Sequence, residues 1–230
     1  MLNVLIPAAV LALIVFGFVG LRGRGADMTP RGLLRFYLYL GSFAGVVLLT
    51  FGASGLLSAG LASAVGDDLV YGRPPETFRP LQPCPPNIPE CEAARARQAE
   101  HPGIEQRKGF IEQRNRRRGD DLVRGITFTT FGALFWLLHF VARRRVAVME
   151  EPLRRSYLMA GTVFFGLATI VLLPWGIYQA ISYLVLPAAP DQFTPGVGDT
   201  LSGGLIALPI WLIYLGSLIK ELRSAPTVNL

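Results

Sequence analysis

Residues 35–56 read RFYLYLGSFAGVVLLTFGASGL, and residues 155–176 read RSYLMAGTVFFGLATIVLLPWG. An overlay without gaps matches the initial Arg, the Tyr-Leu pair and the Gly that follows it in both stretches. After its Arg, each stretch is apolar for long enough to cross a bilayer as a helix. The two stretches therefore predict two similar membrane spans, and the rest of the fold is built around them.

The segments expected to pair with these spans also resemble each other. Residues 132–139 read GALFWLLH and residues 205–214 read LIALPIWLIY, so that a Trp-Leu pair stands near the end of each. A first span followed by such a partner span thus occurs twice. This order predicts two tandem helix pairs.

The composition of the chain is typical of a membrane protein. Of its 230 residues, 51% are hydrophobic and 17% are charged, and the charges gather between apolar runs. The formal net charge of +6 could suggest nucleic-acid binding. In a chain with several spans, the excess of Arg is more simply a topology signal and a contact for anionic lipid headgroups, so we expect no nucleic-acid partner.

We expect an all-α membrane protein with five transmembrane helices: an N-terminal anchor plus two tandem two-helix repeats, with a long extracytoplasmic insertion. The expected segments are the anchor at 1–22, spans at 33–66, 122–142, 156–187 and 200–220, and the insertion at 67–121. The first segment could instead be a signal peptide. An anchor is favoured because no Lys or Arg precedes the apolar run, whereas Arg22 and Arg24 follow it directly.

The distribution of Arg predicts the orientation. The short connectors at 22–35 and 143–155 are rich in Arg, and the short connector at 187–199 has none. Because short basic connectors stay in the cytoplasm, the N-terminus is expected outside and the C-terminus inside. The insertion is also basic, but long connectors escape this rule.

The insertion contains the two cysteines, Cys84 and Cys91, which enclose the sequence PPNIPE. In an oxidising compartment this pair can close a disulfide, which would stabilise the fold by roughly 2–3 kcal/mol. A metal site would need further ligands at suitable spacing, and only His101 is near. We therefore expect a disulfide and no metal.

The second half of the insertion is charged and prone to form a helix. The sequence Ile-Glu-Gln-Arg begins at Ile104 and again at Ile111, with Phe110 beside the second copy. Residues seven apart lie on one side of a helix. Ile104, Phe110 and Ile111 could therefore dock a partner or the membrane surface, although a solvated linker helix explains the pattern equally well.

His139 is the residue within a span that could bind a cofactor. It stands near the expected cytoplasmic end of the third span, four residues before Arg143. Ionisable residues in a membrane are candidates for function, and a haem or chlorophyll ligand is one alternative. The other interpretation is that His139 reaches the nearby interface, and we predict no bound cofactor other than lipid.

Acidic residues stand at the outer ends of the expected spans. Asp120, Asp121 and Asp199 precede expected helices, where carboxylates cap free N–H groups and favour the positive end of the helix dipole. Together with Asp67 and Asp68 they could alternatively bind a divalent cation. No acidic residue stands in the middle of a span, as it would in many transporters driven by protons or sodium.

The chain resembles the DUF5671 family of bacterial integral-membrane proteins. The resemblance rests on Arg35-Phe36-Tyr37-Leu38 with Trp136-Leu137-Leu138-His139, and on Arg155-Ser156-Tyr157-Leu158 with Trp211-Leu212-Ile213-Tyr214. It implies a helical membrane fold in the bacterial cytoplasmic (inner) membrane. It implies no function and no site residues.

The sequence contains no catalytic motif that we recognise. It therefore predicts a non-catalytic accessory or scaffold subunit of a larger bacterial membrane protein complex, respiratory or photosynthetic, with other membrane subunits as partners. A small transporter or channel is the alternative, favoured by the tandem repeat and the Gly-rich spans. A pigment- or haem-binding membrane protein that uses His139 is a further alternative.

Overall fold

The structure is a computed structural model that describes residues 29–75, 104–146, 151–186 and 193–224. Its helices in this part of the chain are α2 (Pro30–Val65), α3 (Asp67–Tyr71), α5 (Ile104–Val146), α6 (Glu151–Val185) and α7 (Gly198–Ser224). α2, α5, α6 and α7 are each long and apolar enough to cross a membrane. The chain is therefore an all-helical, multi-pass membrane protein whose apolar helices would contact lipid. The expected anchor at 1–22 lies outside the described residues.

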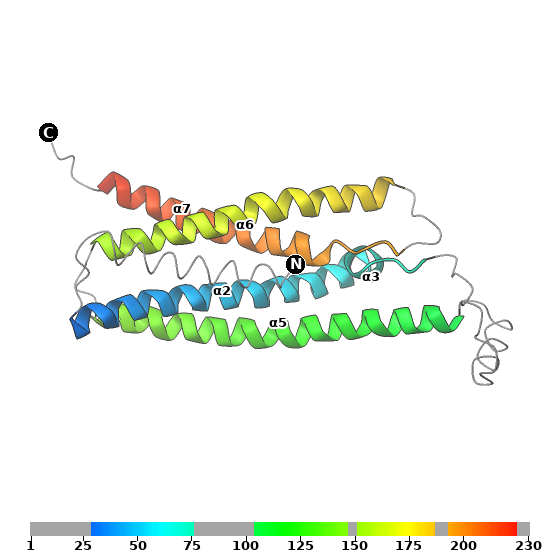
Figure 1. Cartoon of the computed structure of the whole chain (residues 1–230), viewed down its shortest axis with the longest axis horizontal. Coiled ribbons are helices and arrows are strands. Elements are labelled where there is room, and N and C mark those ends of the chain that lie inside the picture. The colour runs from blue at the N-terminus through cyan, green and yellow to red at the C-terminus, as the bar shows by residue number, and fades with distance from the viewer. Residues whose placement is uncertain (1–28, 76–103, 147–150, 187–192, 225–230) are drawn as a thin grey trace, which may run out of the picture.

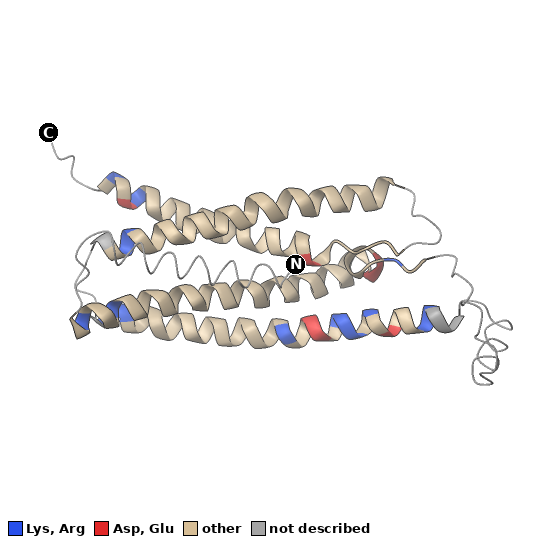
Figure 2. Cartoon of the chain, in the orientation of Figure 1, with Lys and Arg blue, Asp and Glu red and all other residues tan. Residues whose placement is uncertain are grey.

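The four long helices lie side by side in two pairs, α2 with α5 and α6 with α7, and α2 also packs on α7 (Figure 1). One end of the bundle, which we call the basic end, holds the start of α2 and α6 and the end of α5 and α7. Figure 2 shows Lys and Arg on the helices at this end and also on the part of α5 near the other end. The described basic residues at this end are Arg31, Arg35, Arg143, Arg144, Arg145, Arg154, Arg155, Lys220 and Arg223.

α2 and α5 approach each other closely because α2 presents glycines to its neighbour. A Cβ atom added to Gly45 would lie 2.7 Å from the backbone nitrogen of Trp136, and one added to Gly52 would lie 2.2 Å from that of Thr129. Both glycines are buried, as is Gly41 beside His139. Small residues let helix backbones pack closely in a membrane. This small-residue face of α2 therefore packs inside the bundle.

α6 and α7 pack in a similar way. A Cβ atom added to Gly161 would lie 2.1 Å from the ring of Tyr214, and one added to Gly204 would lie 2.8 Å from the backbone of Leu173. At these distances, only the hydrogen atom of glycine fits at either position. Glycine therefore sets the distance between the helices in both pairs.

Polar and aromatic contacts join the two pairs. Ser202 of α7 is fully buried, and its hydroxyl lies 2.6 Å from that of Ser58 and 3.2 Å from that of Ser54, both on α2. Nearer the basic end, Phe43 of α2 packs with three aromatic residues of α6 and α7, namely Tyr157, Phe165 and Tyr214. In a membrane the hydrophobic effect does not drive helices together, because lipid tails are as apolar as the side chains. Hydrogen bonds between helices can then help to hold the bundle together.

The other end of the bundle, which we call the capped end, is covered by α3 and residues 193–198. α3 lies between Gly66 and Gly72, both of which have φ of 102°, a conformation that favours glycine. The backbone N–H of Val197 donates to the carbonyl of Leu69 at 3.0 Å, and Arg73 pairs with Thr194 through the backbone. The cap thereby ties the segment before α7 to the end of α2.

One difference from the sequence-based expectation concerns α5. The charged helix of the insertion and the third span were expected as separate elements, but α5 runs without a break from Ile104 to Val146. A helix satisfies its backbone hydrogen bonds internally, so it can continue from lipid into water without a turn. Asp120 and Asp121 consequently lie within the helix, and the prediction that they cap its start is wrong.

Candidate functional site

His139 is a packed residue of the α2–α5 contact. Its ring is 7% exposed, and its Nδ1–H donates to the carbonyl of Phe135 at 2.8 Å. The opposite edge of the ring faces Gly41, where an added Cβ atom would lie 2.4 Å from Nε2. The ring nitrogens of His139 therefore lie beside protein groups, with Nδ1 against the carbonyl of Phe135 and Nε2 beside Gly41 of α2.

The expected docking residues lie on the part of α5 nearest the capped end. The ring of Phe110 packs against that of Phe193, with centroids 5.0 Å apart, so it contributes to the cap within the chain. Ile111 is 38% exposed and remains available to a partner. Ile104 is the first residue of α5, and its side chain lies outside the described residues.

The cysteines Cys84 and Cys91 and the neighbouring His101 also lie outside the described residues. The disulfide therefore stays a prediction from the sequence.

The carboxylates at the capped end form ion pairs with arginines of α5. Arg114 pairs with Asp68, and Arg118 pairs with Asp67 at 3.4 Å while donating to Ser63 at 2.8 Å. These bonds fasten α3 to α5. Among the described residues, no three His, Cys, Asp or Glu side chains are grouped to hold a metal ion.

Tyr71, the last residue of α3, lies buried under this cap. Burial raises the pKa of its phenol, and the negative charge of Asp121 raises it further. Tyr71 is therefore held in its neutral form.

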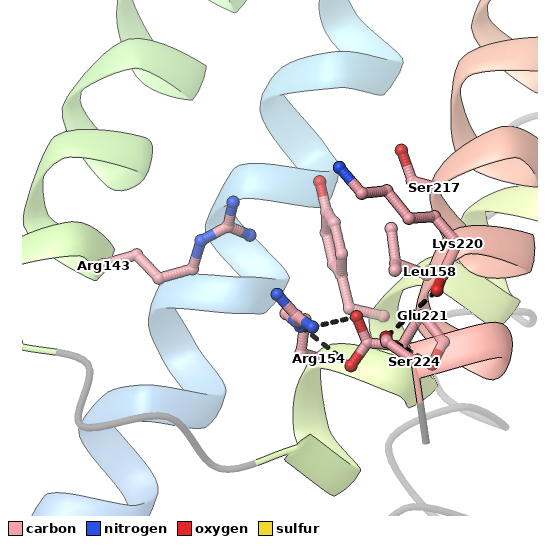
Figure 3. A pocket seen from close by; sticks show the side chains of 8 residues that line it. Arg143, Arg154, Leu158, Ser217, Lys220, Glu221 and Ser224 are labelled. Carbon is pink, nitrogen blue, oxygen red and sulfur yellow. Dashed lines mark hydrogen bonds and ion pairs between the residues drawn. The ribbon is translucent and has the colours of Figure 1, made fainter. Parts of the chain in front are cut away.

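The basic end contains a cavity of about 310 Å³. Figure 3 shows Arg143 reaching from α5 toward side chains of α6 and α7 that complete the walls. The lining residues are Arg143, Arg154, Tyr157, Leu158, Ser217, Lys220, Glu221 and Ser224. In the sequence the Arg residues of this set read only as topology signals, and no pattern there brings them together with Lys220 and Glu221.

Arg143 is held in place by aromatic rings. Its guanidinium carbon lies 4.7 Å from the ring centre of Tyr39, 5.1 Å from that of Tyr157 and 5.5 Å from that of Phe140. Cation–π contacts of this kind fix the plane of the guanidinium and leave its edge free to donate hydrogen bonds. One terminal nitrogen of Arg143 is buried and has no hydrogen-bond partner in the described part of the chain.

Arg154 and Glu221 form an ion pair that connects α6 to α7. The Nε of Arg154 donates to Oε1 of Glu221 at 3.1 Å, and a terminal nitrogen donates to Oε2. The Glu221 side chain is 8% exposed, so the carboxylate is largely removed from water. Both carboxylate oxygens of Glu221 accept hydrogen bonds from Arg154. The negative charge of Glu221 therefore neutralises Arg154 and not the other cations of the cavity.

The other polar groups of the cavity leave it positive. Lys220 extends from α7 in the direction of Arg143 and forms no ion pair with a described residue (Figure 3). The hydroxyls of Ser217 and Ser224 donate to backbone carbonyls of their own helix. Three cations and one carboxylate line the cavity, which suits an anion.

Comparison of the chain with protein-family models, with curated proteins and with solved structures finds no match. The resemblance to the DUF5671 family therefore stays a prediction from the sequence.

Proposed function

We propose that this chain is a non-catalytic accessory or scaffold subunit of a larger bacterial membrane protein complex, with respiratory and photosynthetic complexes as the first candidates. The observation that supports this proposal is the position of α5. Within the described chain, α5 packs mainly on α2, and near its ends it also contacts α3, Phe193 and Tyr157. Many apolar side chains elsewhere on α5 are exposed in the described structure.

α5 presents an apolar row that fits another membrane helix. Val123, Phe131 and Leu138 are each more than 60% exposed, and their spacing places them on one side of the helix. Lipid would cover such a row in a protein that acts alone. A partner helix is the alternative occupant, and the polar continuation of α5 favours it.

That continuation extends well beyond the membrane. With 43 residues, α5 is about 65 Å long, whereas the hydrocarbon core of a bilayer is about 30 Å thick. On the projecting part, Arg107, Lys108, Arg116 and Arg117 are exposed and form no ion pair with a described residue. We infer a membrane-embedded partner that also has an acidic surface outside the bilayer on this side.

Transport is less well supported by this geometry. The glycine contacts bring α2 against α5 and α6 against α7 too closely for a path between the members of a pair. Between the pairs, Ser202 contacts Ser54 and Ser58, and the aromatic cluster around Phe43 joins α2 to α6 and α7. A flux assay in liposomes tests this point, because a scaffold should leave solute flux at the level of protein-free vesicles.

We also infer that α2 with α5 and α6 with α7 are two copies of one helix pair. Equivalent contacts support this inference: Gly41 and Tyr37 lie against His139, and Gly161 and Tyr157 lie against Tyr214. The gapless overlay of the sequence matches these glycines and these tyrosines with each other.

The proposed location is the bacterial inner membrane, with the basic end in the cytoplasm. The many Arg residues at that end support this orientation by the positive-inside rule. The anchor at 1–22 would then begin outside, and the insertion with its predicted disulfide would also lie outside.

The test is purification from native membranes in mild detergent, followed by mass spectrometry of the bound proteins. We expect stoichiometric partners with the native chain and their loss with the double variant Arg116→Gln and Arg117→Gln. The variant with Lys at both positions keeps the charge and should retain them. A native chain that purifies alone, or as a homo-oligomer, would overturn the proposal.

A further inference from the structure

We propose that the cavity at the basic end binds a phosphate ester, with Arg143 and Lys220 as its charged donors. This assignment goes beyond the accessory role and does not depend on it. Four features of the cavity support it: its charge, the fixed position of Arg143, its size and its place at the end of the spans.

The charge that remains in the cavity matches a phosphate group. Arg154 is neutralised by Glu221, which accepts hydrogen bonds through both of its oxygens. Arg143 and Lys220 have no such carboxylate partner among the described residues, and both line the same cavity. Two positive charges suit the single charge of a phosphate diester or the double charge of a monoester.

Arg143 is prepared to bind an anion before one arrives. The rings of Tyr39, Tyr157 and Phe140 hold its guanidinium, and one buried terminal nitrogen has no hydrogen-bond partner in the described chain. A buried donor without a partner is costly, and a phosphate oxygen would satisfy it. A guanidinium that is already fixed loses little conformational freedom when it binds.

The size of the cavity sets a limit on the ligand. A volume of about 310 Å³ lies at the lower end of the range for small-molecule sites, which begins at roughly 300 Å³. The cavity therefore accepts a headgroup or a small phosphate ester and has no space for acyl chains. Leu158 supplies an apolar part of its wall.

The position of the cavity favours a phospholipid as the source of the phosphate. It lies where the long apolar helices α5, α6 and α7 end in basic residues, which is the depth of lipid headgroups. The adjacent surface of α6 carries exposed apolar side chains such as Met159 and Val163, along which acyl chains could lie. A soluble phosphate ester offers the same chemistry and is distinguished by experiment.

The experiment measures lipid binding to the full chain by native mass spectrometry after delipidation, with phosphatidylglycerol as the probe. Arg143→Gln and Lys220→Gln should each weaken binding about tenfold, as expected for the loss of one charge-assisted hydrogen bond. The matched controls are Arg144→Gln and Arg223→Gln, which remove the same charge from exposed neighbours outside the cavity lining. We expect each control to change the affinity less than twofold.

Two conservative variants guard against loss of folding. Arg143→Lys keeps the charge but not the planar donor edge, and it should bind more tightly than Arg143→Gln. Lys220→Arg should retain native binding. Equal losses in the cavity variants and the controls would show a diffuse charge effect and overturn the proposal, as would a native chain that binds no phosphatidylglycerol and no phosphate.

A second arm identifies the source of the phosphate. Inorganic phosphate and glycerol phosphate are titrated into the delipidated protein by calorimetry. Binding of phosphatidylglycerol alone assigns the site to a lipid headgroup. Binding of the soluble anions that is lost in Arg143→Gln but kept in Arg144→Gln assigns it to a soluble phosphate ester.

Discussion

The glycine contacts between α2 and α5 make a quantitative prediction about Gly52→Ala. The added methyl carbon would lie 2.2 Å from the backbone nitrogen of Thr129 and 2.7 Å from the carbonyl carbon of Phe128. Carbon atoms in good contact are about 3.5–4.0 Å apart, so α5 would have to move by about 1 Å. Backbone atoms cannot turn away as a flexible side chain can, and overpacking of this kind costs about 1–3 kcal/mol.

Gly60→Ala on the same helix is the matched control. Gly60 is exposed, and an added Cβ atom there meets nothing within 4 Å. Because Ala favours a helix over Gly by about 1 kcal/mol, this substitution should leave stability unchanged or raise it slightly. The two variants add the same methyl group to the same helix and differ in what that group contacts.

The assay is thermal unfolding in detergent, followed by size-exclusion chromatography of the protein that remains monodisperse. A loss of about 2 kcal/mol corresponds to a midpoint about 4–8 °C lower for a chain of this length. We expect this shift for Gly52→Ala and none, or a small increase, for Gly60→Ala. Equal midpoints for the two variants would refute the close packing of α2 on α5.

Three further predictions concern other parts of the chain. Ser202→Ala should destabilise the bundle by about 1 kcal/mol in the same thermal assay, because it removes hydrogen bonds to α2; Ser217→Ala, which loses a bond within its own helix, should have less effect. Burial raises the pKa of the Tyr71 phenol in the folded chain. The neutral phenol therefore favours the folded state below pH 10, and this contribution is lost as the pH rises above about 10, where the phenol of the unfolded chain ionises. Tyr71→Phe should therefore flatten the decline of the unfolding midpoint between pH 9 and 11. The chain purified without reductant should resist maleimide labelling until it is reduced, because the sequence predicts a disulfide between Cys84 and Cys91.

Periodic features of single helices could be predicted from the sequence. The glycines of α2 recur at helical spacing, which indicates that they share one face of the helix; that this face is buried against α5 is a finding of the structure. Four of the five expected spans correspond to long apolar helices, since length and hydropathy decide whether a helix can cross a membrane. These are properties of one segment at a time.

The length of α5 could not be predicted in the same way. Hydropathy separates the charged residues 104–121 from the apolar residues 122–142. The backbone hydrogen bonds of a helix do not depend on this difference in side-chain polarity. A helix continues as long as each N–H finds its carbonyl four residues earlier. Gly109 and Gly119 weaken the helix only slightly, and the ion pairs of Arg114 and Arg118 with α3 help to hold it.

The cavity depends on residues that are distant in sequence. Arg143, Arg154 and Glu221 come from three helices, and each alone is an ordinary residue at the end of a span. The packing of α2 against both α5 and α7 is what allows Arg143 to reach Tyr157 and the cavity wall. No pattern in the sequence predicts that these residues line one cavity.

The two proposed copies of the helix pair use their equivalent tyrosines differently, and this difference explains where the cavity forms. In the second pair, Tyr157 is 7% exposed, and its hydroxyl lies 2.6 Å from that of Tyr214 inside the bundle. In the first pair, the equivalent Tyr37 is 54% exposed, although its ring still contacts His139, the counterpart of Tyr214. Because Tyr157 faces inward, it can take part in holding the Arg143 guanidinium and line the cavity. The outward-facing Tyr37 cannot do the same for a cation of α7. If the two pairs are copies, as we propose, their different packing would give one proposed anion site instead of two.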